Sequence, residues 1–220
     1  MKILCVGQVE EPSFIKEQVK NQTIQVEDII FHIDEEPAVG IEARRRRIAE
    51  NHIQLKHIVE AYEPDFVFQV EQDAVLPENA LERMIGHYYR LDDHNFGYIS
   101  GIQVGRHGLY CLGAWNFDKD MEAFESIDYK LSGLQKIDAT GFYCLFAPRD
   151  VWLNGICTWD NERWGPDVNW GLSIRKNKYV DMDLHIGHKT NSGIIDVSQP
   201  TTCNARFYKH EGQWVYRQLN

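Results

Sequence analysis

Hydrophobic and polar positions in the first half of the chain follow two different spacings. Short, nearly continuous apolar runs are typical of strands buried on both faces of a sheet, and they predict strands at 2–7, 26–34, 65–70 and 96–104. Apolar residues that recur every three to four positions indicate helices that bury one face. The helices predicted in this way are 13–21, 41–62 and one that begins near Pro77. Strands and helices therefore alternate, which predicts an α/β fold with a mostly parallel central sheet flanked by helices.

The second half of the chain has weaker patterning. Residues 106–135 are rich in Gly, Asp and aromatic residues without a clear period, which predicts a long functional loop with short pieces of structure. Residues 137–148 predict a strong strand, Pro166 suits the first turn of a helix, and 180–188 predict a short last strand. The chain from Lys189 onward is polar and reads as an irregular tail. There is no internal repeat and no Gly/Ser-rich or Pro-rich linker, so we expect one domain.

Composition agrees with an ordinary globular protein. The 220 residues are 43% hydrophobic and 25% charged, which suits one domain with a single large core. No apolar run approaches the roughly 20 residues that a membrane-spanning helix needs. The N-terminal stretch MKILCVGQVEEP becomes acidic within its own length, which argues against a signal peptide. We therefore expect no integral membrane segment.

Cysteine usage and net charge narrow the function further. The five cysteines are odd in number, widely spaced and without a CxxC pair. This pattern argues against a zinc knuckle or a disulfide framework and favours reduced thiols in a cytoplasmic compartment. The formal net charge of −10 argues against binding a nucleic-acid backbone, because phosphate neutralisation needs basic patches. The basic run Arg44–Arg47 is too short to change this, but it is compatible with a small phosphate-bearing ligand.

The acidic triplet Glu71-Gln72-Asp73 directly follows the predicted strand at 65–70. If the strand geometry persists, the two carboxylates point the same way, and such a pair suits Mg²⁺ or Mn²⁺ shared with substrate phosphates. Ligands of α/β sheets bind beyond the carboxyl ends of the strands, and Asp34 lies at another such end. An isolated pair of this kind is more often a turn, because acidic residues are common there. The surrounding sequence has to decide.

Four consecutive arginines, Arg44 to Arg47, lie near the start of the long predicted helix. They cover about 400° of a helix with 3.6 residues per turn, so at least one must face the edge of the sheet. Arg44 and Arg47 are one turn apart and form the best pair for a pyrophosphate. The alternative for most of the run is a solvated helix face.

Three segments occur in the order and spacing of a known family. ARRRRIAENHIQLKHIVEAYEPDFVFQVEQDAVLPENALERM, residues 43–84, resembles the centre of the GT-A nucleotide-sugar glycosyltransferases, particularly family-2-like members. IDATGFYCLFAPRDVW, residues 137–152, resembles the strand and helix that precede the catalytic loop in that family. WGPDVNWGLSIRKNKYVDMDLHIGH, residues 164–188, resembles the segment that runs from the "ED" motif to a late His. The resemblance covers about residues 1 to 190.

The resemblance implies a GT-A, Rossmann-like fold in a single catalytic domain at 1–220. Residues 1–105 would bind the nucleotide sugar, 106–190 would form an irregular, aromatic-rich acceptor and catalytic half, and 191–220 would form a C-terminal tail. It implies a hexosyltransferase-type enzyme of the EC 2.4 class, which uses Mn²⁺ or Mg²⁺. A sugar would move from a UDP- or GDP-type donor to a hydroxyl of an acceptor carbohydrate or another molecule. Inversion is expected, and retention stays open because the sequence does not reveal the attack face.

The first half of the resemblance assigns the donor site. Asp73 matches the last Asp of the DxD-type motif, which makes it the expected metal ligand. Glu71 replaces the first Asp with a longer arm, so Glu71 and Gln72 would contact the nucleotide sugar. Asp34 matches the acidic residue that contacts the nucleotide base, and the run Asp34 to Glu36 offers three candidates.

The second half of the resemblance assigns the catalytic residues. Asp167 matches the acidic residue that acts as the base toward the acceptor hydroxyl. Pro166 stands where the family has Glu, so only half of the motif is present, and a first-turn carboxylate favoured by the helix dipole is the alternative. His188 matches the late His that completes the metal site in several members, with His185 as the alternative.

Trp164 lies beside the candidate base and is the tryptophan that we expect to contact the sugar or the acceptor, because ring faces stack on the apolar faces of sugars. The alternative is that the tryptophans of the second half pack a loop-rich region.

Two other classes of protein compete with this hypothesis. A nucleotidyltransferase of related fold usually has a Gly-rich phosphate loop near its N-terminus, and CVGQVEEPS is not one. A non-catalytic, carbohydrate-binding relic would keep its aromatic residues and lose its metal ligands, whereas Asp73 and His188 are both present.

Overall fold

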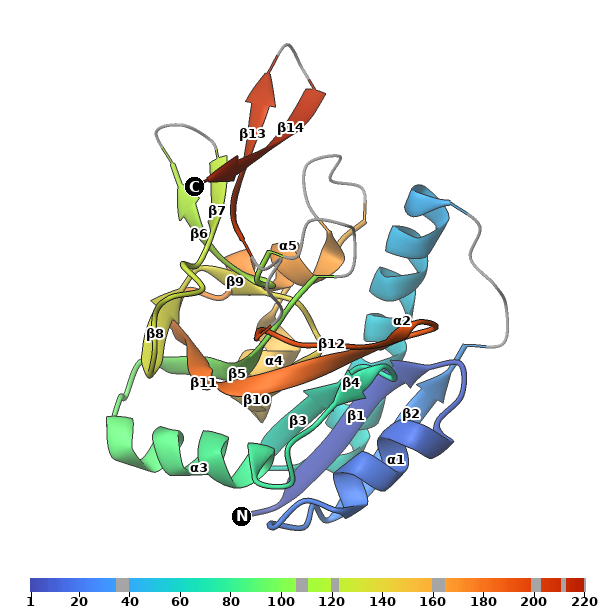
Figure 1. Cartoon of the computed structure of the whole chain (residues 1–220). Helices are drawn as coiled ribbons and strands as arrows, with labels where there is room; N and C mark the ends of the chain where they lie inside the picture. Colours follow the sequence, from blue (N-terminus) through green and yellow to red (C-terminus); the bar gives the residue numbers. More distant parts are fainter. Residues whose placement is uncertain are drawn as a thin grey trace.

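The computed structural model describes residues 1–34, 40–105, 111–119, 123–159, 165–198, 203–210 and 213–219 (Figure 1). The elements of the first half are β1 (Ile3–Val9), α1 (Ser13–Lys20), β2 (Asp28–Ile33), α2 (Ile41–Tyr62), β3 (Phe66–Val70), β4 (Ala74–Val75), α3 (Ala80–Leu91) and β5 (Phe96–Gln103). Those of the second half are β6 (Ala114–Asp118), β7 (Ala123–Ser126), β8 (Leu134–Ile137), β9 (Ala139–Thr140), β10 (Cys144–Pro148), α4 (Arg149–Asn154), α5 (Pro166–Ser173), β11 (Asn177–Thr190), β12 (Gly193–Ile195), β13 (Asn204–His210) and β14 (Gln213–Leu219). The alternation predicted for the first half is confirmed.

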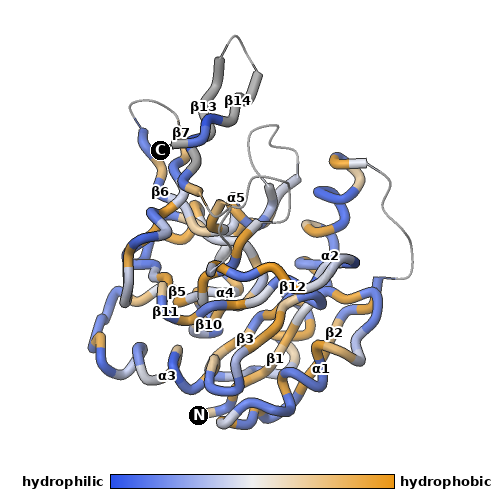
Figure 2. Tube along the Cα trace, viewed as in Figure 1, coloured by the Kyte–Doolittle hydropathy of each residue, from blue (hydrophilic) through white to orange (hydrophobic). Residues whose placement is uncertain are grey.

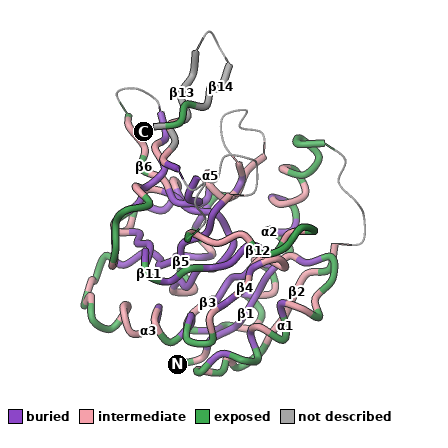
Figure 3. The backbone as a smooth tube through the Cα atoms, in the orientation of Figure 1, coloured by how far each residue is buried: buried purple, intermediate pink, exposed green. Residues whose placement is uncertain are grey.

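The central strands are apolar on both faces, as the nearly continuous apolar runs predict (Figure 2). In β1, Ile3 and Cys5 pack with α1 and α3, whereas Leu4 and Val6 pack with α2, α4 and α5 on the other face. All four side chains are buried. Figure 3 shows the resulting arrangement, with buried strands in the middle and exposed positions on the outer sides of the helices. The core is therefore a sheet between two helical layers.

The central sheet is mixed, and its core strands are mostly parallel. Its strand order is β12-β11-β5-β10-β3-β1-β2. The strands β1, β2 and β3 pair in parallel, as do β5 and β11, but β10 is antiparallel to both of its neighbours. The physical reason is the connection before β10, which runs through short strands instead of the crossover helix that parallel neighbours need.

Two predictions for the second half are wrong. The segment 137–148 is not one strand, because the chain turns at Phe142–Tyr143 and separates β9 from β10. The predicted irregular tail contains β12, β13 and β14. The predicted loop 106–135 contains β6, β7 and the start of β8, which are short pieces of structure as expected there. A second sheet of order β14-β13-β7-β6-β9 collects most of these strands. Their partners are distant in sequence, so no local period revealed them.

Pro77 does not begin a helix. The third helix starts at Ala80, and the Ala80 N–H donates to the Pro77 carbonyl in a turn. The Gln22 side chain holds this turn, because its amide donates to the Pro77 carbonyl over 2.9 Å and its oxygen accepts from the Leu81 N–H over 3.1 Å. The segment after the acidic triplet is thus attached to the end of α1 before α3 begins.

A buried carboxylate attaches α3 to the long strand β11. Oδ2 of the fully buried Asp181 lies 2.7 Å from Nη2 of Arg83 and 2.9 Å from Nε2 of His87. Burial raises the pKa of Asp181, but hydrogen bonds from Arg83 and His87 outweigh it and leave this pKa below its usual value. The ion cluster therefore fixes the strand that leads to His188.

Cys5, Cys111, Cys144 and Cys157 are free thiols, as the cysteine spacing predicts. Burial raises the pKa of the Cys5 and Cys144 thiols well above the usual range, so both act as small hydrophobes in the core. Within the described ranges, no helix combines the length and the hydropathy needed to cross a membrane.

Candidate functional site

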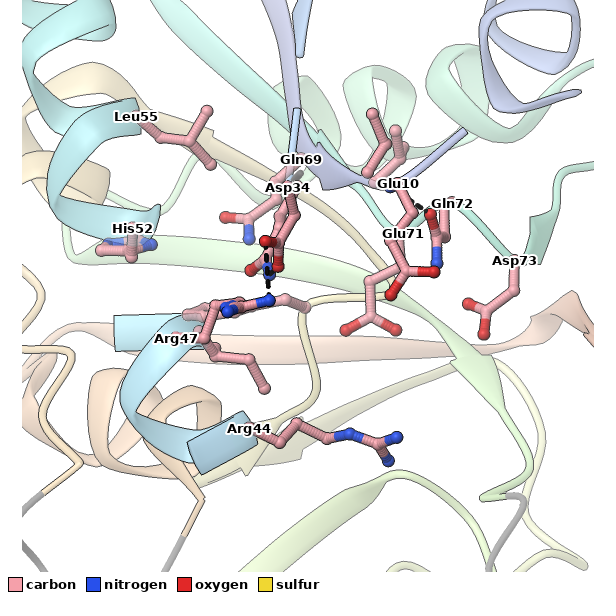
Figure 4. Close-up of a pocket in the computed structure, with 15 residues that line it drawn as sticks. Glu10, Asp34, Arg44, Arg47, His52, Leu55, Gln69, Glu71, Gln72 and Asp73 are labelled. Atoms are coloured by element: carbon pink, nitrogen blue, oxygen red, sulfur yellow. Dashed lines mark hydrogen bonds and ion pairs between the residues drawn. The ribbon is translucent and has the colours of Figure 1, made fainter. Parts of the chain in front are cut away.

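A pocket of about 310 Å³ lies where the parallel strands β1, β2 and β3 end and α2 begins (Figure 4). The strand ends present polar residues there, because the buried apolar runs stop at Val9, Ile33 and Val70. Six residues predicted from the sequence line this pocket together, namely Asp34, Arg44, Arg47, Glu71, Gln72 and Asp73. In Figure 4 the labelled pocket residues extend from His52 and Leu55 on α2, past Asp34 and Arg47, to Glu71 and Asp73.

Asp34 is held in place by neighbours on two elements. Its Oδ1 lies 2.9 Å from Nη1 of Arg47, and its Oδ2 accepts from Gln8 over 3.1 Å and from Asn51 over 3.5 Å. Arg47 therefore pairs with Asp34 rather than forming a free pair with Arg44. In the described part of the chain, the Arg44 side chain makes no ion pair, and Figure 4 shows it extending toward the side of the pocket that holds Glu71 and Asp73. Of the two arginines, Arg44 is the one whose guanidinium would be available to an anionic ligand.

The acidic triplet is both a turn and part of the pocket. The strand ends at Val70, and the Ala74 N–H donates to the Glu71 carbonyl over 3.2 Å, which closes the turn. The Gln72 side-chain oxygen accepts from the Glu10 N–H over 2.6 Å and thereby ties the end of β1 to the end of β3. This role holds the loop together, so the Gln72 oxygen is engaged by the backbone. The turn leaves the Glu71 and Asp73 carboxylates at the pocket.

Asp73 and His188 lie side by side although 115 positions separate them. Nε2 of His188 is 3.2 Å from Oδ2 of Asp73, and Nδ1 of His188 is 3.1 Å from the carbonyl oxygen of Val104. The His188 side chain is 6% exposed and the Asp73 side chain is 14% exposed. Backbone pairing brings them together, because β11 pairs with β4 at His188 and Ala74 and the Lys189 N–H donates to the Asp73 carbonyl. His185 instead faces Asp196 at 3.6 Å, so of the two histidines only His188 adjoins Asp73.

The chemistry of this dyad follows from the Val104 carbonyl. A carbonyl oxygen only accepts hydrogen bonds, so Nδ1 of His188 carries the proton that it donates. In a neutral ring, Nε2 then turns its lone pair toward the Asp73 carboxylate, which is repulsive unless a proton or a cation lies between them. Within the described ranges, no group of three His, Cys, Asp or Glu residues is placed to hold a metal ion. The dyad would supply two ligands of such a site.

Asp167 lies outside the lining of this pocket. It occupies the first turn of α5 after Pro166, as the sequence predicts, and is partly buried. Burial raises the pKa of its carboxyl, against the opposing effect of the backbone N–H groups of Val168 and Asp167. A Cβ built on Gly141 would lie 3.4 Å from Oδ2 of Asp167, and the next residue, Phe142, lines the pocket. Asp167 thus lies close to Gly141, next to the pocket residue Phe142.

The structure places the tryptophans of the second half in different environments. Trp164, the predicted sugar contact, lies outside the described residues, as do Glu35 and Glu36. Trp170 is fully buried in the core, which is the packing role that the sequence left open. Trp159 lies under the Arg46 guanidinium, 4.4 Å from the ring centroid.

His52 is a pocket residue that the sequence reasoning missed. It is 2% exposed, and its ring is parallel to Phe142 with centroids 5.2 Å apart and lies against Trp152 at 4.5 Å. Among the described residues, neither ring nitrogen has a hydrogen-bond partner. Burial, and to a smaller extent the Lys56 charge, lowers the pKa of His52 to about 3, so the ring is neutral. Its place in the apolar spacing between Ile48 and Leu55 was the available signal.

Comparison with known proteins adds information on the fold alone. No family model matches the chain, and no curated protein matches it. A solved structure described as the crystal structure of A197 from STIV is similar, with a TM-score of 0.54 at 16% identity over 87% of each chain. At that identity the similarity supports a shared α/β architecture with a mixed sheet and carries no statement about activity.

Proposed function

We propose that the chain is a metal-dependent glycosyltransferase that moves a sugar from a nucleoside-diphosphate donor to an acceptor hydroxyl. The observation that carries this proposal is the contact between Asp73 and His188 at the edge of a pocket that also contains Arg44. The sequence resemblance to GT-A enzymes assigned Asp73 and His188 to one metal site, and they are neighbours. The five residues predicted to bind the donor line one pocket together with Asp73, namely Asp34, Arg44, Arg47, Glu71 and Gln72.

The dyad suits a divalent ion bound together with a diphosphate. A carboxylate oxygen and an imidazole nitrogen are both ligands that Mn²⁺ accepts. Metal-bound histidines commonly donate their other ring N–H to a carbonyl or carboxylate, as Nδ1 of His188 does to Val104. Phosphate oxygens and water would complete the set, as they often do for Mg²⁺. When bound, the ion supplies positive charge that favours departure of the diphosphate.

The chain's own residues divide the remaining tasks. Arg44 would bind the diphosphate, because its side chain extends toward the acidic side of the pocket. Asp34, oriented by Gln8 and Arg47, would accept hydrogen bonds from the nucleoside. Asp167 would take the proton of the acceptor hydroxyl at a carboxylate oxygen, and its raised pKa makes it a stronger base than an exposed Asp. The acceptor would then approach from the side of α5 and Gly141.

The proposal is tested with UDP-, GDP-, CDP- and TDP-sugars, with and without Mn²⁺. We expect release of nucleoside diphosphate from at least one donor in the presence of Mn²⁺, and its loss in EDTA. Turnover that persists in EDTA contradicts the metal dependence. Formation of a nucleotide sugar from a nucleoside triphosphate and a sugar phosphate, with pyrophosphate release, would instead identify a nucleotidyltransferase.

Asp167→Asn tests the assignment of the base. With the acceptor present, we expect transfer to slow by about 100-fold or more, because positioned general bases contribute roughly that factor. Donor affinity should stay near the wild-type value, since Asp167 lies outside the donor pocket. The measurement is the rate of sugar transfer against the binding constant for the donor. Full transfer by the variant would exclude Asp167 as the base, and Asp150→Asn, an exposed first-turn carboxylate of α4, is the matched control.

A further inference from the structure

A second hollow lies away from the candidate donor pocket and has the opposite charge. It has a volume of about 530 Å³ and lies between β6, β8, the end of α5 and the start of β11. Five cationic residues line it, namely Lys119, Lys136, Arg175, Lys176 and Lys178. The whole chain has 23 Lys and Arg against 33 Asp and Glu, so the lining of this hollow is positively charged in a protein of negative net charge. We call it the basic pocket.

The carboxylates around the basic pocket offset only part of this charge. Asp138 lines it and accepts a hydrogen bond from the Phe117 N–H over 2.8 Å, and Asp150 lies 3.3 Å from the Lys176 ammonium. The Lys178 ammonium is buried and donates to the Gly171 and Ile174 carbonyls at the end of α5. Within the described part of the chain, Lys119 and Arg175 have no carboxylate partner. Unpaired like charges around one hollow repel one another, and a bound anion removes that cost.

The cations come from elements that are fixed relative to one another. β8, which carries Lys136, pairs with β11 so that Lys178 lies opposite Ile137. Lys136 lies over the Tyr179 ring, with its ammonium 6.0 Å from the ring centroid. Arg175 and Lys176 belong to the short connection between α5 and β11. Figure 1 shows β8 beside β11, so the backbone around the pocket is fixed, and the Lys136 ammonium lies on the Tyr179 side of the sheet.

The position of the basic pocket separates it from the donor pocket. Asn177 pairs with Phe96, the first residue of β5, so the start of β11 lies at the amino end of that strand. The donor pocket lies at the carboxyl ends of β1 and β3. The two pockets share no lining residue. A ligand of the basic pocket is therefore not the nucleotide-sugar donor.

We propose that the basic pocket binds a small molecule that bears several phosphate groups. Its volume is in the range of small-ligand sites, roughly 300 to 1,000 Å³, and Arg175 offers the planar guanidinium that binds phosphate through two parallel hydrogen bonds. A nucleic acid is the less favoured occupant, because its backbone needs an extended basic track and the net charge of −10 repels it at a distance. The ligand occupies one hollow, not a stripe across the surface.

Titration calorimetry with inorganic tripolyphosphate tests this proposal, with EDTA present to remove divalent ions. We expect the double variant Lys119→Glu/Arg175→Glu, which reverses the two cations without a carboxylate partner among the described residues, to lose affinity by at least about tenfold. Both side chains are exposed, so the variant should fold. The matched control Lys16→Glu/Lys20→Glu, an equal charge change on exposed positions of α1, should keep the wild-type affinity.

Three outcomes would overturn the proposal. The first is absence of tripolyphosphate binding by the wild-type protein at millimolar concentration, and the second is an equal loss in the test and control double variants. The third is displacement of tripolyphosphate by a short single-stranded oligonucleotide that binds more tightly. None of them depends on glycosyltransferase activity, so failure here and failure of the proposed function are distinct results.

Discussion

Asp73→Asn is expected to lower metal-dependent turnover of the nucleotide-sugar donor about 100-fold or more, while the protein stays folded. The amide keeps the shape of the side chain and can donate to Nε2 of His188, which is 3.2 Å from Oδ2 in the wild-type protein. It removes the negative charge, and a divalent ion binds a carboxylate much more strongly than an amide. The loss of rate corresponds to the several kcal/mol that a metal ion contributes to stabilising the transition state.

The measurement pairs turnover with Mn²⁺ affinity from calorimetry. Both should fall together in Asp73→Asn. The control is Glu10→Gln, which neutralises another carboxylate that lines the same pocket but does not adjoin His188. Wild-type Mn²⁺ affinity in Asp73→Asn would place the metal elsewhere. Equal losses in the two variants would mean that only the net charge of the pocket matters.

His52→Phe is expected to remove a large part of the acid sensitivity of the fold. Below pH 6.5 the unfolded chain protonates this histidine, whereas in the folded protein its pKa is about 3. The stability that depends on this ring is complete above pH 6.5 and is lost as the pH falls, at about 1.4 kcal/mol per pH unit. Between pH 6.5 and about pH 4.5 the wild-type protein should therefore lose roughly 3 kcal/mol from this residue alone.

Urea unfolding at several pH values measures this effect. Phenylalanine keeps the stacked ring between Phe142 and Trp152 and removes two unpaired buried nitrogens, at the risk of overpacking by about 1–3 kcal/mol. Overpacking shifts the free energy of unfolding at every pH, so the pH slope remains the decisive quantity. His57→Phe is the matched control, because that ring is on the same helix and 69% exposed. A wild-type slope in His52→Phe would assign the acid sensitivity to other groups.

The sequence predicted the first half of the fold well because its core is made of local patterns. The runs around Leu4 and Phe68 are buried on both faces, and the spacing of Leu55 and Val59 matches one face of a helix. The direction of β10 follows from the route of the chain through β6 to β9, and no residue within 144–148 encodes that route. The second sheet was missed for the same reason, since its pairs join positions as distant as Phe124 and Phe207.

The sequence predicted which residues line the candidate site, but it did not predict which of their side chains contact one another. Strand ends and family resemblance placed Asp34, Arg47 and Asp73 in one site, and they line one pocket. That Arg47 pairs with Asp34 depends on how α2 packs against the sheet. The burial of His52 depends on Trp152, which is 100 positions away in the sequence and belongs to the core cluster that also contains Leu55.

The strand β11 also fixes the number of residues between Asp181 and His188. Its first part pairs with β5 and β8, it shifts register between Val180 and His185, and its last part pairs with β4 and β12. Asp181 is fixed to α3 at one end of this stretch, and His188 adjoins Asp73 at the other. Side chains alternate along a strand, so adding or removing one residue between them would turn His188 to the opposite face. The seven-residue separation of positions 181 and 188 is therefore constrained, and insertions or deletions in related chains should fall outside this segment.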